Sequence, residues 1–283
     1  MAVQVLVTLD GTVLDPKLPL LTADDLAAVR GDGVFETLLV RDGAAREEGP
    51  HLARLARSAA MLDLPEPDLD RWRGCIAAVV EHWVGKDDFA LRLILSRGGE
   101  SSGTATGYAT GSPISATVLA QQTNGLAAVT LDRGVSSDAA ERAPWLLLGA
   151  KTLSYAVNMA ALRHAGRLGA EDVVFTSTDG YVLEGPTSTV VLATGRTLRT
   201  PPAEAGILPG TTQGVLFRAA ERAGWECEVG PVRAEDLLTA DGVWLASSIR
   251  LLARVHTLDG EALGDAATGA RLTTELQQLL AGA

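Results

Sequence analysis

Cysteine is scarce in this chain, and the two cysteines present have no partners in the sequence. Cys75 and Cys227 lie far apart, and neither has a histidine at the spacing of a zinc site. The sequence therefore predicts no disulfide framework and no metal centre, and it places both thiols in the core.

Long apolar runs and clusters of positive charge are also missing. No stretch of about 18 uncharged apolar residues occurs, as a membrane-spanning helix requires, and no basic segment leads into an apolar one as in a secretory signal. The formal net charge is −11, with Lys and Arg dispersed along the chain. We therefore expect a soluble, cytoplasmic protein that binds neither membranes nor nucleic acids, and any anionic ligand must be held by a local group of cations.

The chain has the length and apolar content of a globular protein. With 283 residues, 47% of them hydrophobic, it can bury one large core or two modest ones. No internal repeat is visible.

The first half alternates between strand and helix patterns. Two-residue alternation predicts strands, and apolar spacing of three and four predicts amphipathic helices. A Gly-, Ser- and Thr-rich segment without apolar period predicts a loop. The predicted strands are 3–7, 12–14, 34–40, 89–96 and 113–120, the helices 51–62 and 71–83, and the loop 98–111.

The second half predicts a further sheet with helices. Turns at Asp179-Gly180 and Gly195-Arg196 separate short strands, which indicates an antiparallel meander. Helices are predicted at 152–167, 211–223 and 267–281, and strands at 127–131, 172–178, 181–183, 189–193, 197–200, 243–246 and 253–258. The fold class is therefore α+β, with a small N-terminal domain (1–120), a linker (121–126) and a larger C-terminal domain (127–283).

Lys151 is the strongest candidate for a catalytic residue. Lysine is rare here, and the other two, Lys17 and Lys86, lie in polar contexts. Lys151 follows the apolar segment 146–150, so an inward-facing amine would be partly desolvated, as a Schiff-base nucleophile requires. The alternative is a surface lysine.

Two later segments could bind the other parts of a cofactor, namely a ring nitrogen and a phosphate. Glu184 lies at a predicted strand end, where a carboxylate can hold a pyridine nitrogen protonated. Gly210, Thr211 and Thr212 open a helix, where free backbone N–H groups bind a phosphate. Each has a structural alternative, a solvated carboxylate and a simple helix cap. Together with Lys151, however, they indicate an enzyme that holds pyridoxal 5′-phosphate.

The first half adds a cation and a glycine-rich turn. Arg54 lies one helical turn after His51, and its guanidinium can grip a phosphate through two hydrogen bonds. Gly31 and Gly33 precede a strand, which indicates either a turn or a backbone that passes close to a ligand.

These segments occur in the order of a known family. The chain resembles the class IV, fold-type IV pyridoxal-phosphate enzymes, which include aminodeoxychorismate lyases, D-amino-acid transaminases and branched-chain transaminases, and it is most similar to the lyases. The resemblance covers nearly the whole chain and is carried by Gly31-Asp-Gly-Val-Phe-Glu-Thr37, His51-x-x-Arg54-Leu55, the Lys151 segment, Gly180-Tyr-Val-Leu-Glu184-Gly185 and Leu208-Pro-Gly210-Thr211-Thr212.

The resemblance implies a fold, a cofactor site and an assembly. It implies a two-domain fold with pyridoxal 5′-phosphate in the cleft between the domains of a homodimer. Lys151 would be the Schiff-base lysine, Glu184 the partner of the pyridine nitrogen, and Tyr155 the partner of the ring hydroxyl. The phosphate would be held by Arg54, Leu208, Gly210, Thr211, Thr212, Ser247 and Ser248.

The substrate is expected to be a small amine or amino acid with a carboxylate. Among the arginines, Arg97 is favoured because it adjoins the glycine-rich loop; Arg92 and Arg30 are further candidates. Arg92 has a structural alternative, a pair with Asp87 or Asp88. Thr37 is expected to place a hydroxyl near the reacting carbon.

Two reactions remain open, because they share their first steps. Lys151 would remove the proton from the carbon that bears the substrate nitrogen. In a lyase, the electrons then expel the enolpyruvyl group of 4-amino-4-deoxychorismate and give 4-aminobenzoate and pyruvate, a step of folate biosynthesis. In a transaminase of D-amino acids or branched-chain L-amino acids, the proton returns to the cofactor. We favour the lyase; a bifunctional enzyme is also compatible, and a non-catalytic binding protein of the same fold is the remaining alternative.

Overall fold

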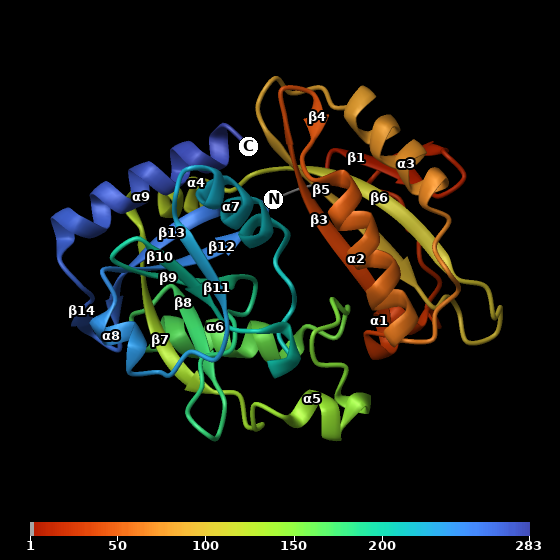
Figure 1. Cartoon of the computed structure of the whole chain (residues 1–283). Helices are drawn as coiled ribbons and strands as arrows, with labels where there is room; N and C mark the ends of the chain where they lie inside the picture. Colours follow the sequence, from red (N-terminus) through yellow and green to blue (C-terminus); the bar gives the residue numbers. More distant parts are fainter. Residues whose placement is uncertain (1–2) are drawn as a thin grey trace. The chain divides into compact units, whose positions relative to one another are not determined.

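The structure, a computed structural model, describes residues 3–283 (Figure 1). These residues divide into two compact units by their contacts. The first unit runs to Ala116 and includes Ala150–Tyr155; the second comprises Thr117–Gly149 and Ala156–Ala283. Within the described range, none of the helices is long and apolar enough to cross a membrane.

The first unit is built on an antiparallel sheet. Its strands run in the order β2-β1-β6-β5-β3-β4, with neighbours antiparallel. The strands are β1 (Val5–Thr8), β2 (Val13–Leu14), β3 (Gly33–Arg41), β4 (Ala44–Ala45), β5 (Phe89–Ser96) and β6 (Thr106–Pro113), and the helices are α1 (Leu26–Arg30), α2 (Glu48–Met61) and α3 (Leu69–Glu81).

One face of this sheet carries the core of the unit. Helix α2 packs on β3, and α3 packs on β1 and β6 (Figure 1). Leu38 of β3 and Leu52 and Leu55 of α2 are fully buried, because apolar positions recur at two-residue spacing in the strand and at helical spacing in α2. Residues on alternate positions of β3, such as Phe35 and Thr37, therefore lie on the other face.

The second unit contains a mixed sheet. Its strand order is β11-β10-β9-β12-β13-β7-β8, with β14 paired to β13. The β10–β11, β13–β7 and β7–β8 pairs are parallel, and the others are antiparallel. The strands are β7 (Leu126–Asp132), β8 (Asp172–Thr176), β9 (Thr189–Thr194), β10 (Thr197–Thr200), β11 (Glu226–Val229), β12 (Gly242–Ser247), β13 (Leu251–Leu258) and β14 (Glu261–Ala262).

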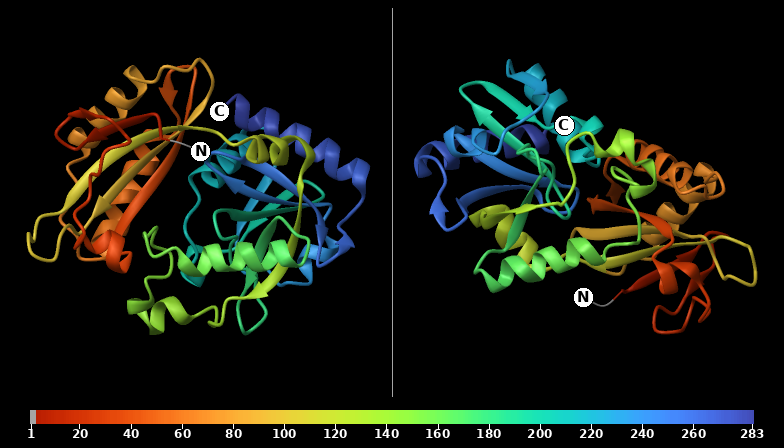
Figure 2. Two further views of the ribbon diagram at one scale, coloured as in Figure 1. Left: turned by 180° about the vertical axis from the view of Figure 1, so that it is seen from behind. Right: turned by 90° about the horizontal axis from the view of Figure 1, so that it is seen from below.

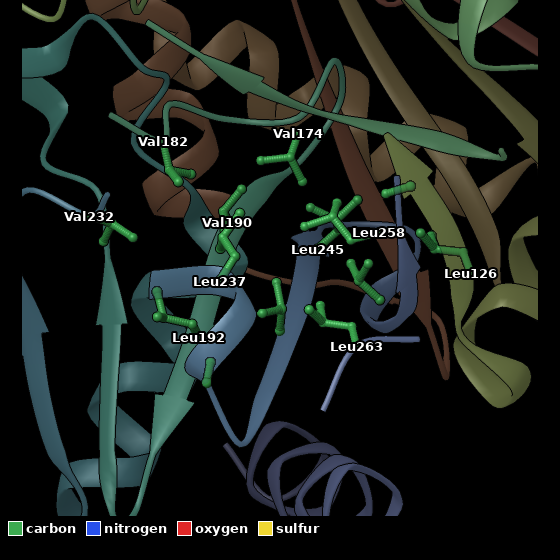
Figure 3. Close-up of a cluster of buried hydrophobic side chains, with 14 of the residues drawn as sticks. Leu126, Val174, Val182, Val190, Leu192, Val232, Leu237, Leu245, Leu258 and Leu263 are labelled. Carbon is green, nitrogen blue, oxygen red and sulfur yellow. The ribbon is translucent and has the colours of Figure 1, made fainter. Parts of the chain in front are cut away.

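Helices cover this sheet over three apolar clusters. The helices are α4 (Ala116–Asn124), α5 (Ala139–Arg142), α6 (Ala156–Arg167), α7 (Thr211–Arg222), α8 (Asp236–Thr239) and α9 (Ala266–Ala281). Helices α7 and α9 bury Trp244 of β12, and α6 covers β7 and β8 (Figure 2). Figure 3 shows the third cluster, in which Leu237 of α8 packs with Val190, Leu192 and Leu245 of the sheet. Cys75 is buried in the first unit, and Cys227 is half-buried against the α7 cluster.

Three predicted elements were wrong. The predicted strand 181–183 is only a pair of isolated bridges, at Tyr181 and Val182. Residues 98–111 are not all loop, because β6 begins at Thr106 and pairs with both β5 and β1. Its glycines leave room for α3, since a Cβ on Gly111 would lie 3.2 Å from Val79 and 3.3 Å from Trp83. Residues 113–120 are not a strand: Ala116–Asn124 is a helix, and its single buried residue, Gln121, gives no apolar period to predict it.

The division of the chain also differs from the predicted boundaries. The predicted linker 121–126 overlaps the end of α4 and the start of β7. The predicted helix 152–167 begins only at Ala156. The preceding residues, Ala150–Tyr155, pack with the first unit rather than with the C-terminal one, because they are extended and hydrogen-bond to β3.

Gly98 provides a test of the loop between β5 and β6. Its φ is +94°, and a Cβ there would collide with the Thr104 carbonyl group. Gly98→Ala should lower the free energy of unfolding by about 2 kcal/mol or more, measured by urea denaturation. Gly103→Ala is the control, since Gly103 has a φ of +63° but no atom within 4 Å of a Cβ; an equal loss in both variants would show that the collision has no effect.

Candidate active site

Lys151 is held by backbone hydrogen bonds within the first unit. The Lys151 carbonyl oxygen accepts from the Phe35 N–H at 3.1 Å, and the Leu153 N–H donates to the Gly33 carbonyl at 2.8 Å. The Lys151 N–H donates to Ser58 Oγ of α2 at 3.1 Å. The lysine backbone is therefore fixed by β3 and α2. The close approach of this segment requires a glycine at position 33, since a Cβ there would lie 2.7 Å from Leu153 Cδ1, and also 2.6 Å from the Leu95 carbonyl oxygen of β5.

The Lys151 amine lies over an aromatic ring. Its Nζ is 4.5 Å from the centre of the Phe35 ring, and the side chain is half-buried. The Tyr155 ring meets the same phenyl ring edge-on, with centroids 5.5 Å apart. The face of an aromatic ring attracts a cation, so Phe35 orients both Lys151 and Tyr155.

A buried carboxylate lies behind Phe35, on the helix-covered face of the sheet. Glu36 is fully buried. Its Oε1 accepts from Arg54 Nε at 2.7 Å, and its Oε2 accepts from Arg54 Nη2 at 2.7 Å and from the His51 ring at 2.7 Å. This fork fixes the Arg54 guanidinium on α2 through two of its nitrogens.

The charges in this cluster are set by burial and by Arg54. Burial raises the pKa of Glu36, but hydrogen bonds and charge from Arg54 and His51 outweigh it and bring the pKa to about 2. Burial lowers the pKa of His51, opposed by Glu36 and assisted by the charges of Arg54 and Lys151. His51 is therefore neutral near pH 7, and its Nδ1 carries the proton, because an ionised carboxylate only accepts.

Glu184 is anchored within the second unit. Its Oε2 accepts from the Leu208 N–H at 3.0 Å, and its Oε1 lies 3.6 Å from Arg133 Nη1. Its carbonyl oxygen accepts from the Phe175 N–H at 2.9 Å. Backbone and side chain are both held, so the carboxylate has a defined direction.

The predicted phosphate-binding residues of this unit converge. Gly210 is the residue before α7, and Thr211 and Thr212 form its first turn. Thr211 Oγ1 lies 3.4 Å from Ser248 Oγ, and Ser247 ends β12 just before it. A helix N-terminus with hydroxyl groups beside it is a site for an anion.

The substrate arginines have different surroundings. The Arg97 guanidinium donates to Asp32 and to the carbonyl oxygens of Leu62 and Asp63, which is the bonding of a structural arginine. Arg92 is exposed and lies opposite Thr37 in the β3–β5 register. Arg30 is exposed in the last turn of α1. The structure therefore favours Arg92, and the assignment of Arg97 to substrate stays a prediction.

Sequence reasoning did not assign Glu36, Ser58 or Arg133 to the site. A signal for Glu36 existed, since two-residue alternation places it on the same face as Val34 and Leu38, and a buried carboxylate needs a partner. No sequence pattern indicates Arg133 or Ser58, because their partners are distant along the chain.

The Glu36 cluster gives a stability prediction. Glu36→Gln removes the charge and leaves Arg54 buried without its counter-ion, so the free energy of unfolding at pH 7 should fall by about 3 kcal/mol or more. The folded pKa of about 2 lies below the ordinary value of 4.5, so the stabilisation is present above about pH 4.5 and is lost as the pH falls toward 2. Urea denaturation at pH 7 and pH 3 measures both effects.

A surface carboxylate on α3 provides the control for this measurement. Asp70 is highly exposed and pairs with Arg73, so Asp70→Asn should change stability little at either pH. A loss from Glu36→Gln that was equally small would show that the buried pair contributes nothing to folding.

Comparison with known proteins finds a family and relatives that cover most of the chain. The family model described as amino-transferase class IV matches residues 33–258. A bifunctional aminodeoxychorismate lyase / D-amino acid transaminase of Mycobacterium tuberculosis is 55% identical over 266 residues, 91% of this chain and 92% of that protein. A D-alanine aminotransferase of Bacillus licheniformis is 27% identical over 88% of this chain and 87% of its own length.

Solved structures of related proteins have the same fold as this chain over almost its whole length. A protein of Mycobacterium tuberculosis described as a hypothetical aminotransferase, in a PLP-bound form, is 53% identical with a TM-score of 0.95, and the match covers 98% of this chain and 97% of that one. A fold IV transaminase of Curtobacterium pusillum is 41% identical with a TM-score of 0.93, at 98% and 99% coverage. These similarities confirm the predicted α+β, fold-type IV architecture, and the chain belongs to the class IV aminotransferase family.

Proposed function

We propose that the protein is a pyridoxal-phosphate-dependent aminodeoxychorismate lyase that also transaminates D-amino acids. The observation that carries the proposal is the 55% identity, over nine-tenths of both chains, to a relative named for both activities. The lyase reaction converts 4-amino-4-deoxychorismate to 4-aminobenzoate and pyruvate.

The donor set of the described residues fits this cofactor. A half-buried amine, a carboxylate with a fixed direction and a helix N-terminus beside hydroxyl groups match its aldehyde, ring nitrogen and phosphate. When bound, pyridoxal phosphate bonds covalently to an amine and accepts electrons from the carbon next to the substrate nitrogen. A related structure is described as a PLP-bound form, which supports the assignment.

In this proposal the residues have separate roles. Lys151 carries the cofactor and, once displaced, holds and moves the proton of the substrate carbon; its fixed backbone and the Phe35 ring limit where the amine can go. Glu184 holds the proton of the ring nitrogen. Tyr155 donates to the ring oxygen.

The phosphate is assigned to residues with backbone N–H groups, hydroxyl groups or a positive charge. Gly210, Thr211 and Thr212 offer backbone N–H groups at the start of α7, with Leu208 preceding them, and Ser247 and Ser248 offer hydroxyl groups. Arg54 adds positive charge, and Glu36 holds its guanidinium rigid.

For the substrate carboxylate we propose Arg92, supported by the geometry of β3 and β5. Phe35, which contacts Lys151, and Thr37 are two residues apart, so they share a face of the sheet. Arg92 pairs with Thr37 in register and takes part in no ion pair within residues 3–283. Arg92 and Thr37 therefore lie on the face that carries the lysine.

The second activity has its own support. Several relatives of this chain are named as transaminases, including the D-alanine aminotransferase of Bacillus licheniformis, and one related structure is described as an alpha-ketoglutarate and PMP bound form.

We also propose a homodimer, supported by large exposed apolar side chains of the second unit, Trp145 and Val157 among them.

A parallel assay of the holoenzyme tests the reaction. Aminodeoxychorismate should yield 4-aminobenzoate and pyruvate, and D-alanine with 2-oxoglutarate should yield pyruvate more slowly. Lys151→Ala should abolish both reactions and the borohydride-reducible cofactor adduct, whereas Lys86→Ala, at an exposed lysine, should change neither. Amino transfer from L-leucine without any 4-aminobenzoate would contradict the proposal.

Arg92 and Arg97 are distinguished by a matched pair of variants. Arg92→Gln should raise the KM for the carboxylate substrate by about tenfold or more, since a hydrogen bond to a charged group contributes about 1.5–3 kcal/mol, and should leave Tm unchanged. Arg97→Gln should lower Tm, because Asp32 and two carbonyl groups lose their donor. The reverse outcome would assign the carboxylate to Arg97.

A further inference from the structure

We propose that Arg133 is a positioning residue for Glu184: its guanidinium fixes the direction of the Glu184 carboxylate toward the cofactor ring nitrogen. The inference rests on the proposed role of Glu184 as the partner of that nitrogen. Both residues belong to the second unit.

The backbone of Arg133 is tied to the end of the sheet. Arg133 directly follows β7, and its N–H donates to the Thr176 carbonyl oxygen at 2.8 Å, at the point where Asp132 and Thr176 pair in register. The position of the Arg133 backbone is thus fixed by the C-terminal ends of the parallel strands β7 and β8.

Phe175 connects Arg133 to Glu184. The guanidinium carbon of Arg133 lies 4.6 Å from the centre of the Phe175 ring, and this ring is buried. The Phe175 N–H donates to the Glu184 carbonyl oxygen at 2.9 Å, and its own carbonyl oxygen accepts from the Leu183 N–H at 2.8 Å. One residue therefore supports the arginine with its ring and the glutamate with its backbone, which leaves the planar guanidinium little freedom.

The two oxygens of Glu184 have different partners. Oε2 accepts from the Leu208 N–H at 3.0 Å, and Oε1 lies 3.6 Å from Arg133 Nη1. The longer distance exceeds that of a direct hydrogen bond, so the arginine acts mainly through its charge. Without Arg133, the carboxylate would lose the positive charge beside its Oε1.

The position of the pair makes this charge effective. The side chains of Arg133 and Glu184 are 19% and 15% exposed, so solvent screens them less than a surface pair. Leu208, the other anchor, stands two residues before Gly210 and the first turn of α7. The direction of Glu184 is therefore tied both to the end of β7 and to the proposed phosphate turn.

Cofactor affinity in a double-mutant cycle tests the inference. Apoprotein variants Arg133→Gln, Glu184→Gln and the double variant are titrated with pyridoxal phosphate, and the dissociation constant is read from absorbance. Arg133→Gln should weaken binding about 5- to 10-fold alone, and less than about twofold when Glu184 is already Gln, because contacting residues are coupled. Arg142→Gln, at an exposed arginine of α5 that pairs with Asp138, should have no effect.

A spectroscopic measurement separates positioning from folding. Arg133→Gln should change the pH profile of the cofactor absorption band in the same direction as Glu184→Gln, while Tm of the apoprotein stays close to that of the parent. Arg133→Lys keeps the charge but not the planar stacking, so its affinity should fall between those of the parent and Arg133→Gln; it serves as the test if the glutamine variant does not fold.

The outcomes distinguish this inference from the function on which it rests. Equal weakening by Arg133→Gln in both backgrounds, or none in either, would overturn the role of Arg133. A Glu184→Gln variant with parental affinity and an unchanged absorption band would instead remove Glu184 from the ring nitrogen, and with it the basis of the proposed site.

Discussion

A single buried carboxylate organises the first unit. Glu36 has no contact with solvent, and an unpaired charge at such a position would cost several kcal/mol. The structure avoids this cost by placing Arg54 and His51, one turn apart on α2, directly on the two carboxylate oxygens. The pair sets the register of α2 on β3, and Ser58 of the same helix then binds the Lys151 N–H.

The second unit uses the same principle for Glu184, the carboxylate proposed to bind the ring nitrogen. Glu184 is only partly exposed, and each of its oxygens has a partner from a different part of the chain. One partner, Leu208, lies just before the first turn of α7, and the other, Arg133, directly follows β7. Glu184, the proposed partner of the ring nitrogen, is thus hydrogen-bonded to the segment that carries the proposed phosphate turn at Gly210. A shift of either one should therefore displace the other.

The acidic composition of the chain makes the placement of each cation informative. Arg54 and Arg97 are both bound to carboxylates of the first unit, which fix their guanidinium groups. Arg92 is exposed on the sheet face that carries Phe35 and Thr37, so its charge remains available to an anionic group. Two arginines five residues apart therefore differ in their surroundings: Arg97 holds the turn after α2 to Asp32, and Arg92 is the one proposed to bind substrate.

The sequence alone determined the family, the fold class and the cofactor, because the motifs that carry them need only residue type and order to be found; the roles of Lys151, Glu184 and the Gly210 turn stay predictions. It also predicted most strands and helices of the first unit, where the period of apolar residues is regular. The tertiary structure alone decided that Lys151 lies in an extended segment that hydrogen-bonds to β3. It alone also decided that β6 is a strand and that Ala116–Asn124 is a helix. It also decided the partners of Glu36, Glu184 and Arg97. These features depend on hydrogen bonds between residues distant along the chain, which leave no periodic pattern in the sequence.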